Sequence, residues 1–246
     1  MRLLLTILLL AAIVETAAAG DDIPLPRPRP ADAPSAMPTE PSACRLRIAD
    51  RAVIEPLPPL VGPGACGAPD VVRLDAVIMP DNTHVAFAPP PTLRCSMAEA
   101  VADWVRADIG PTAAVLGAPL VSIENYDSYD CRGMNRVVGA KLSEHGKANA
   151  LDIRSVKLAD GKVIRLTPVT VSLAFRERIR ETACARFMTV LGPGSDGYHE
   201  EHVHVDLAER HGDYRICHWE IHEPPPVAEI PLPRPRPEFA ADQRKP

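Results

Sequence analysis

Two proline-rich flanks limit how much of this chain can fold. The segment IPLPRPRP occurs at residues 23–30 and again, letter for letter, at residues 230–237. Proline lacks the backbone N–H that helices and sheet ladders use, and repeated proline favours an extended polyproline II chain. We therefore expect a proline-rich linker at residues 20–42, a proline-rich tail at residues 222–246, and one folded domain at residues 43–221 between them.

The repeated segments allow two interpretations. Their arginines can contact anionic wall polymers or lipid headgroups, which would make each segment a docking site for a partner in the cell envelope. Alternatively, each segment is a solvated, semi-rigid spacer without a specific ligand. The sequence leaves this choice open.

The N-terminus predicts export. Arg2 is followed by the apolar run LLLTILLLAAIV and then by ETAAAG, whose small residues match the A-x-A arrangement of a signal-peptidase site. The apolar run has about a dozen residues, whereas a membrane-spanning helix needs about 20. We therefore interpret residues 1–19 as a removed signal peptide, with an uncleaved anchor as the alternative, and expect the protein in the periplasm or cell envelope.

The cysteines agree with an exported protein. An even number of cysteines in an oxidising compartment predicts three disulfides. Order along the chain predicts the pairs Cys44–Cys66, Cys95–Cys131 and Cys184–Cys217. No CxxC motif occurs, which gives little support to a thiolate metal site or to thioredoxin-like chemistry.

Composition predicts one globular domain and disfavours one class of partner. The chain has 246 residues, of which 46% are hydrophobic, enough for one domain with a real core. Its formal net charge of -5, without a long basic run, argues against a nucleic-acid-binding protein, whose affinity would depend on neutralising phosphates.

The central region mixes helical and strand patterns. Residues 96–99, SMAE, have the S-x-x-E form of a capping box and predict a helix that runs to about Ile109. A second helix is expected at residues 172–187. Strands are expected at 71–78, 120–126, 150–158, 163–166 and 202–207, with a hairpin around Asp160-Gly161. This mixture predicts an α+β fold, with a small antiparallel sheet and flanking helices.

Two segments carry the residues that suggest chemistry, LSEHGKANALDI at 142–153 and GYHEEHVHVDL at 197–207. Asp152 has apolar neighbours, and a buried carboxylate needs a partner because an unpaired buried charge is costly. Side chains two apart on a strand share a face, so His202 and His204 point the same way. Two such imidazoles, with a distant histidine and a carboxylate, match a catalytic zinc site with three protein ligands and one open position.

These motifs also resemble a known family. The pattern S-x-H-x-x-A-x-A-x-D at residues 143–152, followed by H-x-H at 202–204, resembles the signatures of the zinc D-Ala-D-Ala carboxypeptidase and hedgehog-like fold group. More closely, the runs YDCRGMN, LSEHGKANALDI and VLGPGSDGYHEEHVHVDL resemble the bacterial extensin-like C-terminal domain family, which belongs to that group. The resemblance covers about residues 44–220. Ala148 departs from it, because the broader group has glycine there.

The resemblance implies a D-Ala-D-Ala carboxypeptidase/hedgehog-like fold and a zinc site. Its ligands would be His145, Asp152 and His204. Zinc would activate water for attack on a peptide carbonyl, and the base that takes the proton would be Glu201 or His202. Glu201 precedes His204 by three residues, a spacing that the broader group uses for its catalytic glutamate, so we expect Glu201 to be the base and His202 to hydrogen-bond the oxyanion.

Further residues are candidates for binding substrate or supporting the site. Arg132 aligns with an arginine that contacts substrate in the broader group, and its guanidinium fork suits a carboxylate; alternatively it is a surface arginine beside a disulfide. Ser143 either hydrogen-bonds substrate or orients its loop. Asp206 is a weaker candidate, as an acceptor for a ligand imidazole, and His199 is an alternative ligand to His202.

The expected function is an exported zinc metallopeptidase, a peptidoglycan hydrolase that cleaves the peptide cross-links of the cell wall. Whether it would act as a carboxypeptidase or an endopeptidase, and on which bond, the sequence leaves open. The alternative is a non-catalytic wall-binding or scaffolding protein tethered by its proline-rich ends. A third interpretation is a hydrolase that uses the same site on a substrate outside the wall.

Overall fold

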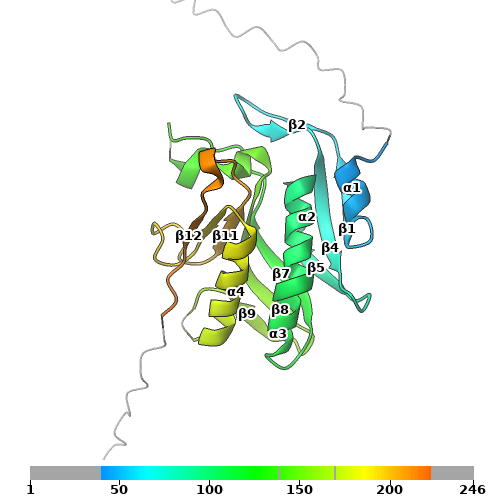
Figure 1. Ribbon diagram of the computed structural model, residues 1–246, viewed down its shortest axis with the longest axis vertical. Helices are drawn as coiled ribbons and strands as arrows, with labels where there is room; N and C mark the ends of the chain where they lie inside the picture. Colours follow the sequence, from blue (N-terminus) through cyan, green and yellow to red (C-terminus); the bar gives the residue numbers. More distant parts are fainter. Residues whose placement is uncertain (1–39, 138, 169, 223–246) are drawn as a thin grey trace, which may run out of the picture. The chain divides into compact units, whose positions relative to one another are not determined.

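The structure, a computed structural model, describes residues 40–137, 139–168 and 170–222, and these are built on one large mixed sheet (Figure 1). In spatial order its main strands are β1 (Ala52–Leu57), β4 (Val71–Ile78), β5 (His84–Ala88), β7 (Leu120–Asp127), β8 (Ala150–Leu158), β11 (Val203–Asp206), β10 (Thr189–Leu191) and β12 (Ile216–His218). The predicted signal peptide and both copies of IPLPRPRP lie outside the described residues.

The sheet is larger than the sequence predicted. It has ten strands, because β6 (Thr92–Arg94) also pairs with β4 and β9 (Val163–Arg165) with β8. Strands β5 and β7 are parallel, as are β10 and β12, and the other pairs are antiparallel. The prediction of a small antiparallel sheet is therefore wrong, although the α+β class holds. Short strands such as β6 and β10 carry too few residues to show alternation, yet they pair through their backbones.

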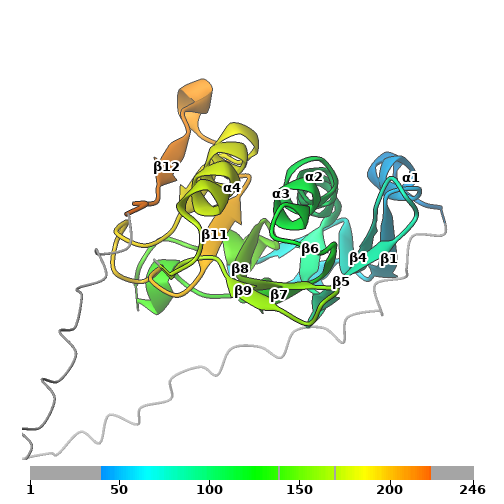
Figure 2. The same cartoon turned by 90° about the horizontal axis from the view of Figure 1, so that it is seen from below.

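Three helices cover one face of this sheet (Figure 2). They are α2 (Cys95–Trp104), α3 (Gly110–Ala114) and α4 (Leu173–Arg186); a short α1 (Ala43–Ile48) lies at the β1 end. Trp104 is buried between sheet and helices, where its Nε1–H donates to Thr182 Oγ1 at 3.0 Å and its ring meets Phe187 edge-on, with centroids 5.2 Å apart. This contact fixes α2 against α4.

The first predicted helix is interrupted. It begins at Cys95, with Arg94 as its N-cap, so the predicted capping box at Ser96 is wrong. From Val105 to Ile109 the turns widen into a π-helix before α3 continues the chain. Pro111 follows the widened turn, and proline cannot donate the helical hydrogen bond. The second prediction is confirmed, because Ser172 caps α4 through a bond from Phe175 N–H to its Oγ.

The long strands match their predictions. Strands β4 and β8 have the predicted bounds, and β7 is one residue longer than predicted. Strands β8 and β9 form the predicted hairpin, closed by a hydrogen bond from Leu158 N–H to Lys162 O at 2.9 Å. Strand β11 is one residue shorter at each end than the predicted segment 202–207.

Three disulfides tie the fold together: Cys44–Cys95, Cys66–Cys131 and Cys184–Cys217. Only the last was predicted; the pairs Cys44–Cys66 and Cys95–Cys131 are wrong, because α1 packs beside α2 and brings Cys44 to Cys95 across 51 residues of chain. Three disulfides are typical of a protein that folds outside the reducing cytoplasm. None of the helices within the described ranges has the length and apolar character needed to span a membrane.

Candidate metal centre

Strand alternation explains how a carboxylate can stand in an apolar run. Leu151 and Ile153 of β8 pack into the helix-covered core, so Asp152 between them points to the opposite face of the sheet. On β11, His204 lies between two core valines in the same way. Asp152 and His204 are direct partners in the antiparallel register of β8 and β11. The sheet therefore places a carboxylate and an imidazole side by side.

His145 reaches the same point from a loop. It lies in the 3-10 turn η3 (Glu144–Lys147), whose N-cap Ser143 accepts a hydrogen bond from His145 N–H at 3.3 Å. The turn ends at Ala148, whose backbone is left-handed with φ of 51°. Nδ1 of His145 lies 2.5 Å from the carbonyl oxygen of Ser128. A carbonyl only accepts, so Nδ1 carries the hydrogen and the lone pair of Nε2 faces Asp152 and His204.

The three ligand atoms form a compact triangle. His204 Nδ1 is 2.8 Å from Asp152 Oδ1 and 3.2 Å from His145 Nε2, and the remaining edge, from His145 Nε2 to Asp152 Oδ1, is 3.3 Å. Two ligands at about 2.0–2.1 Å from a tetrahedral zinc ion are about 3.3 Å apart. The residues are only 1%, 2% and 6% exposed for His145, Asp152 and His204. Their donor set and spacing fit a zinc ion held by three protein ligands.

Asp206 orients the second imidazole. Its Oδ2 lies 3.2 Å from His204 Nε2, while its Oδ1 accepts hydrogen bonds from Thr189 Oγ1 at 2.6 Å and from Ala208 N–H at 2.9 Å. The carboxylate therefore holds the hydrogen on Nε2 and leaves His204 Nδ1 directed at the ligand triangle. This is the acceptor role that the sequence suggested for Asp206.

Burial and neighbouring charges strongly shift the pKa values of Asp152 and His204. Burial by itself would raise the pKa of Asp152, but hydrogen bonds and charge from His145 and His204 hold that pKa well below its ordinary value. Burial likewise opposes a charge on His204, yet Asp152 and Asp206 raise its pKa to about 10. A metal ion at this site therefore competes with a proton on His204.

His202 lies beside the triangle without being part of it. Its Nε2 is 3.3 Å from Asp152 Oδ2, the carboxylate oxygen that does not face the ligand imidazoles. Its ring packs on Tyr126 with centroids 4.6 Å apart. The pKa of His202 is lowered, chiefly by burial and further by the neighbouring imidazoles, against the opposing charge of Asp152. His202 is therefore a neutral imidazole at the edge of the candidate centre.

His199, which the sequence suggested as an alternative ligand to His202, also lies in the site. It is buried, and its ring centroid lies 5.1 Å from that of His202 and 5.6 Å from that of His204. Its Nδ1 lies 2.7 Å from Asp196 Oδ1, which also accepts the N–H of Tyr198. The Asp-x-x-His spacing at 196–199 is the sequence signal that marks this orientation.

Glu201 lies apart from the ligands. Its side chain is 66% exposed, and its carboxylate lies 3.6 Å from the guanidinium groups of Arg154 and Arg165. It is not among the residues that line the cavity over the ligands. Side chains three residues apart share a face on a helix but not on an extended chain. The chain before β11 is not helical, so the spacing between Glu201 and His204 does not place both side chains together.

Arg132 and Ser143 line the cavity but are engaged within the protein. Arg132 donates from Nη2 to Asp127 at 2.8 Å and from Nε to Asp130 at 3.1 Å, and Arg136 pairs with the same two carboxylates. The charge of Arg132 is therefore already compensated. Ser143 caps η3 and so orients the loop, which is one of the two roles that the sequence suggested; contact with substrate stays a prediction.

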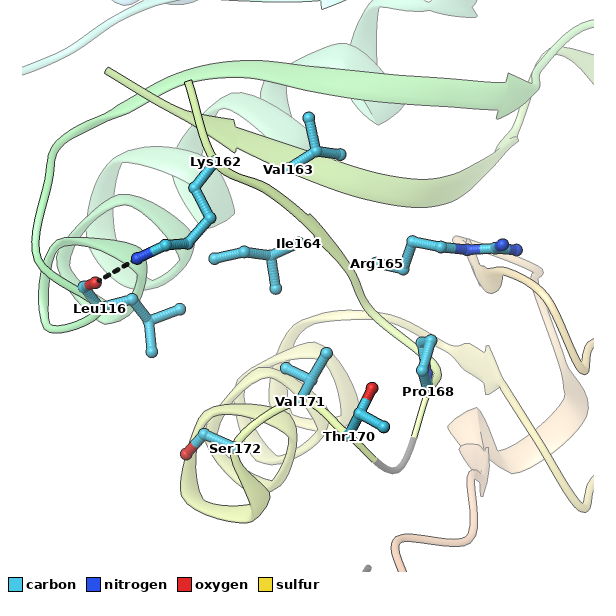
Figure 3. A pocket seen from close by; sticks show the side chains of 9 residues that line it. All are labelled: Leu116, Lys162, Val163, Ile164, Arg165, Pro168, Thr170, Val171 and Ser172. Atoms are coloured by element: carbon cyan, nitrogen blue, oxygen red, sulfur yellow. Dashed lines mark hydrogen bonds between the residues drawn. The ribbon is translucent and has the colours of Figure 1, made fainter. Parts of the chain in front are cut away.

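The ligand triangle opens into a cavity of about 760 Å³. The loop between β7 and β8 forms one part of its lining, the loop wall. The rest comes from β10, β12, the loop between β10 and β11, and the chain after β11. A second cavity, of about 420 Å³, lies where β9 meets the segment that leads into α4 (Figure 3). Its nine lining residues include neither a histidine nor a carboxylate, so it offers no comparable chemistry.

Comparison with known proteins gives one match. A family model described as the extensin-like protein C-terminus matches residues 42–218, from α1 through β12. No curated protein and no solved structure matches the chain. The matched region contains every residue of the candidate centre.

Proposed function

This chain belongs to the extensin-like protein C-terminus family, and we propose that it is an exported zinc-dependent peptidase that cleaves the peptide cross-links of peptidoglycan. The observation that carries the proposal is the buried triangle of two imidazole nitrogens and one carboxylate oxygen, with edges of 2.8 to 3.3 Å, beneath a cavity. We further propose the D-Ala-D-Ala carboxypeptidase and hedgehog-like group as its fold relatives, on the spaced S-x-H and H-x-H motifs.

His145, Asp152 and His204 would hold the zinc ion. When bound, zinc supplies Lewis-acid chemistry, which polarises a peptide carbonyl and lowers the pKa of water from about 15.7 to about 7. The protein's part is to keep the three ligand atoms fixed. It does so through the Ser128 carbonyl on His145 and through Asp206 on His204.

We assign the proton transfer to His202 rather than to Glu201. His202 lines the cavity and contacts the ligand Asp152, whereas Glu201 faces Arg154 and Arg165 outside it. A base must lie within hydrogen-bond reach of the proton that it takes, and a neutral imidazole can accept one near neutral pH. Once protonated, the same ring can donate a hydrogen bond to the developing oxyanion.

The substrate class and the location are inferred from the compartment and from the resemblance to the fold group. Peptidoglycan lies outside the cytoplasmic membrane, and three disulfides together with the predicted signal peptide favour that compartment. The choice of wall peptides comes from the resemblance to the fold group, which is an argument by analogy. Zinc would be the cofactor and peptidoglycan peptides the substrate.

The test is digestion of purified sacculi by the full-length protein and by its His204→Ala variant. We expect near-stoichiometric zinc and released peptide fragments for the wild type, detected by metal analysis and mass spectrometry, and neither for the variant. If both proteins release the same products, or the wild type binds no zinc, the peptidase proposal fails and the scaffolding alternative is favoured.

A further inference from the structure

The Lys and Arg side chains that line the cavity over the candidate ligands differ in whether a carboxylate already compensates their charge. Five line it, namely Arg132, Arg136, Lys141, Lys147 and Arg210. The two arginines of the loop wall pair with Asp127 and Asp130, and Lys147 pairs with Glu144 at 2.5 Å. Among the described residues, Lys141 and Arg210 make no ion pair within 4.0 Å; Glu209, beside Arg210 in the chain, also lines the cavity without pairing.

Arg210 is the one of these two that is held in place. Its Nη1 donates to Met188 O at 2.9 Å and its Nη2 to Thr189 Oγ1 at 2.5 Å, and its guanidinium lies 5.4 Å from the ring of Tyr214. Arg210 is half-buried, whereas Lys141 is exposed. Both acceptors are neutral, so they orient the guanidinium without neutralising it, and a charge held in position binds an anion at lower entropic cost.

The position of Arg210 links it to the candidate centre. Thr189, which accepts from Arg210, donates to Asp206, and Asp206 holds His204. Three hydrogen bonds therefore connect the guanidinium to a candidate metal ligand. Arg210 lines the cavity from the chain after β11, whereas Arg132 lines it from the β7–β8 loop.

We propose that Arg210 binds a carboxylate of the substrate peptide and makes the site selective for peptides that carry one near the scissile bond. The inference rests on the proposed function, because it names a substrate feature for that same cavity. A guanidinium matches a carboxylate with paired N–H donors, and charge-assisted hydrogen bonds are the stronger ones. The carboxylate belongs to the C-terminus of the peptide or to an acidic residue within it.

The test measures binding and turnover of three stem peptides by the full-length protein. One peptide has all carboxylates free, one has an amidated C-terminus, and one has an amidated glutamate. For the wild type we expect one of the two amidated peptides to bind about 10- to 100-fold more weakly than the free peptide, which identifies the carboxylate. Arg210→Gln should bind the free peptide as weakly as that amidated one, and Arg210→Lys should fall between.

Lys141→Gln is the matched control, since Lys141 is the other lining cation without an ion pair to any described residue. We expect it to keep the wild-type preference, and zinc content and thermal unfolding to stay near wild type for all variants. The inference is overturned if the wild type binds the three peptides equally, if Arg210→Gln weakens all three by the same factor, or if Lys141→Gln removes the preference. Carboxylate-selective binding without hydrolysis would overturn the proposed peptidase while supporting the role of Arg210.

Discussion

The candidate centre joins two regions of different construction, the strand pair β8–β11 and the loop between β7 and β8. The strands bring Asp152 and His204 together by cross-strand register, so a continuous ladder fixes these two ligand atoms. The loop brings His145 on a single 3-10 turn, held by the Ser143 cap and the Ser128 carbonyl. Asp152 and His204 are therefore held by the sheet, whereas the position of His145 depends on local hydrogen bonds.

The largest effect is expected when the candidate ligand on β8 is replaced. Asp152→Asn removes the negative charge that balances the buried imidazoles, and we expect zinc affinity to fall by at least about 100-fold and peptide release from sacculi to stop. Metal analysis after dialysis measures the first effect. Glu201→Gln is the control, because it makes the same chemical change outside the cavity. A variant at 152 that keeps stoichiometric zinc contradicts the ligand assignment.

The next effect separates the two candidate bases. His202→Ala should lower kcat by about 10²- to 10⁴-fold, the usual contribution of a general acid–base group, and should retain zinc. Glu201→Gln should stay within about threefold of the wild type, since its carboxylate is engaged with Arg154 and Arg165. Steady-state turnover of a stem peptide checks both. Loss of turnover in Glu201→Gln alone would restore the assignment that the E-x-x-H spacing suggested.

A smaller effect is expected from the group that orients one of the two candidate ligand imidazoles. His204 is oriented by a side chain, Asp206, whereas His145 is oriented by a backbone carbonyl that substitution cannot remove. Asp206→Ala should therefore weaken zinc binding by about 10- to 100-fold. Competition with a chelator measures this, and Thr189→Val, which removes one of the hydrogen bonds to Asp206, should give a smaller loss in the same direction. Unchanged affinity in Asp206→Ala would mean that register alone positions His204.

The bounds of the long strands could be predicted from the sequence, whereas the short strands and two of the disulfide pairs could not. Strands β4 and β8 are long enough to show their pattern, and their bounds agree with the structure. The three-residue strands β6 and β10 carry no such pattern, so the sheet was predicted too small. Two disulfide pairs were wrong because pairing depends on which elements pack together, such as α1 on α2, and not on order in the chain.

For the site residues too, local patterns were predictable from the sequence and tertiary contacts were not. The faces to which Asp152 and His204 point are encoded locally, because each lies between apolar residues on a strand with period two. Their pairing across β8 and β11 is a tertiary contact. The spacing of Glu201 to His204 misled, because side chains three residues apart share a face only on a helix, and this segment is not helical. The compensation of Arg132 by Asp127 and Asp130, and the lack of an ion pair at Arg210 among the described residues, are tertiary facts that the spacing of residues does not reveal.

The loop between β7 and β8 depends on local hydrogen bonds, so removing one of them should lower the thermal stability of the domain. Ser143→Ala removes the cap of η3, and losing such a cap costs about 1 kcal/mol. For a domain of this size that lowers Tm by about 2–4 °C. Thermal unfolding and KM are measured together, because KM should hardly change if Ser143 only orients the loop. A tenfold higher KM with an unchanged Tm would instead make Ser143 a substrate contact.

The smallest effect is expected at Ala148, where the pattern that the sequence resembles has glycine. The φ of 51° favours glycine at this position, because a left-handed backbone costs an L-residue about 1–2 kcal/mol. Ala148→Gly relieves this strain, but it removes a fully buried methyl worth about 0.8 kcal/mol and adds about 0.4–1 kcal/mol of unfolded-state freedom. The contributions nearly cancel, so Tm should move by less than about 2 °C. A rise well above that would show that strain outweighs the packing of Ala148 and that the loop ligand His145 is held at a net cost.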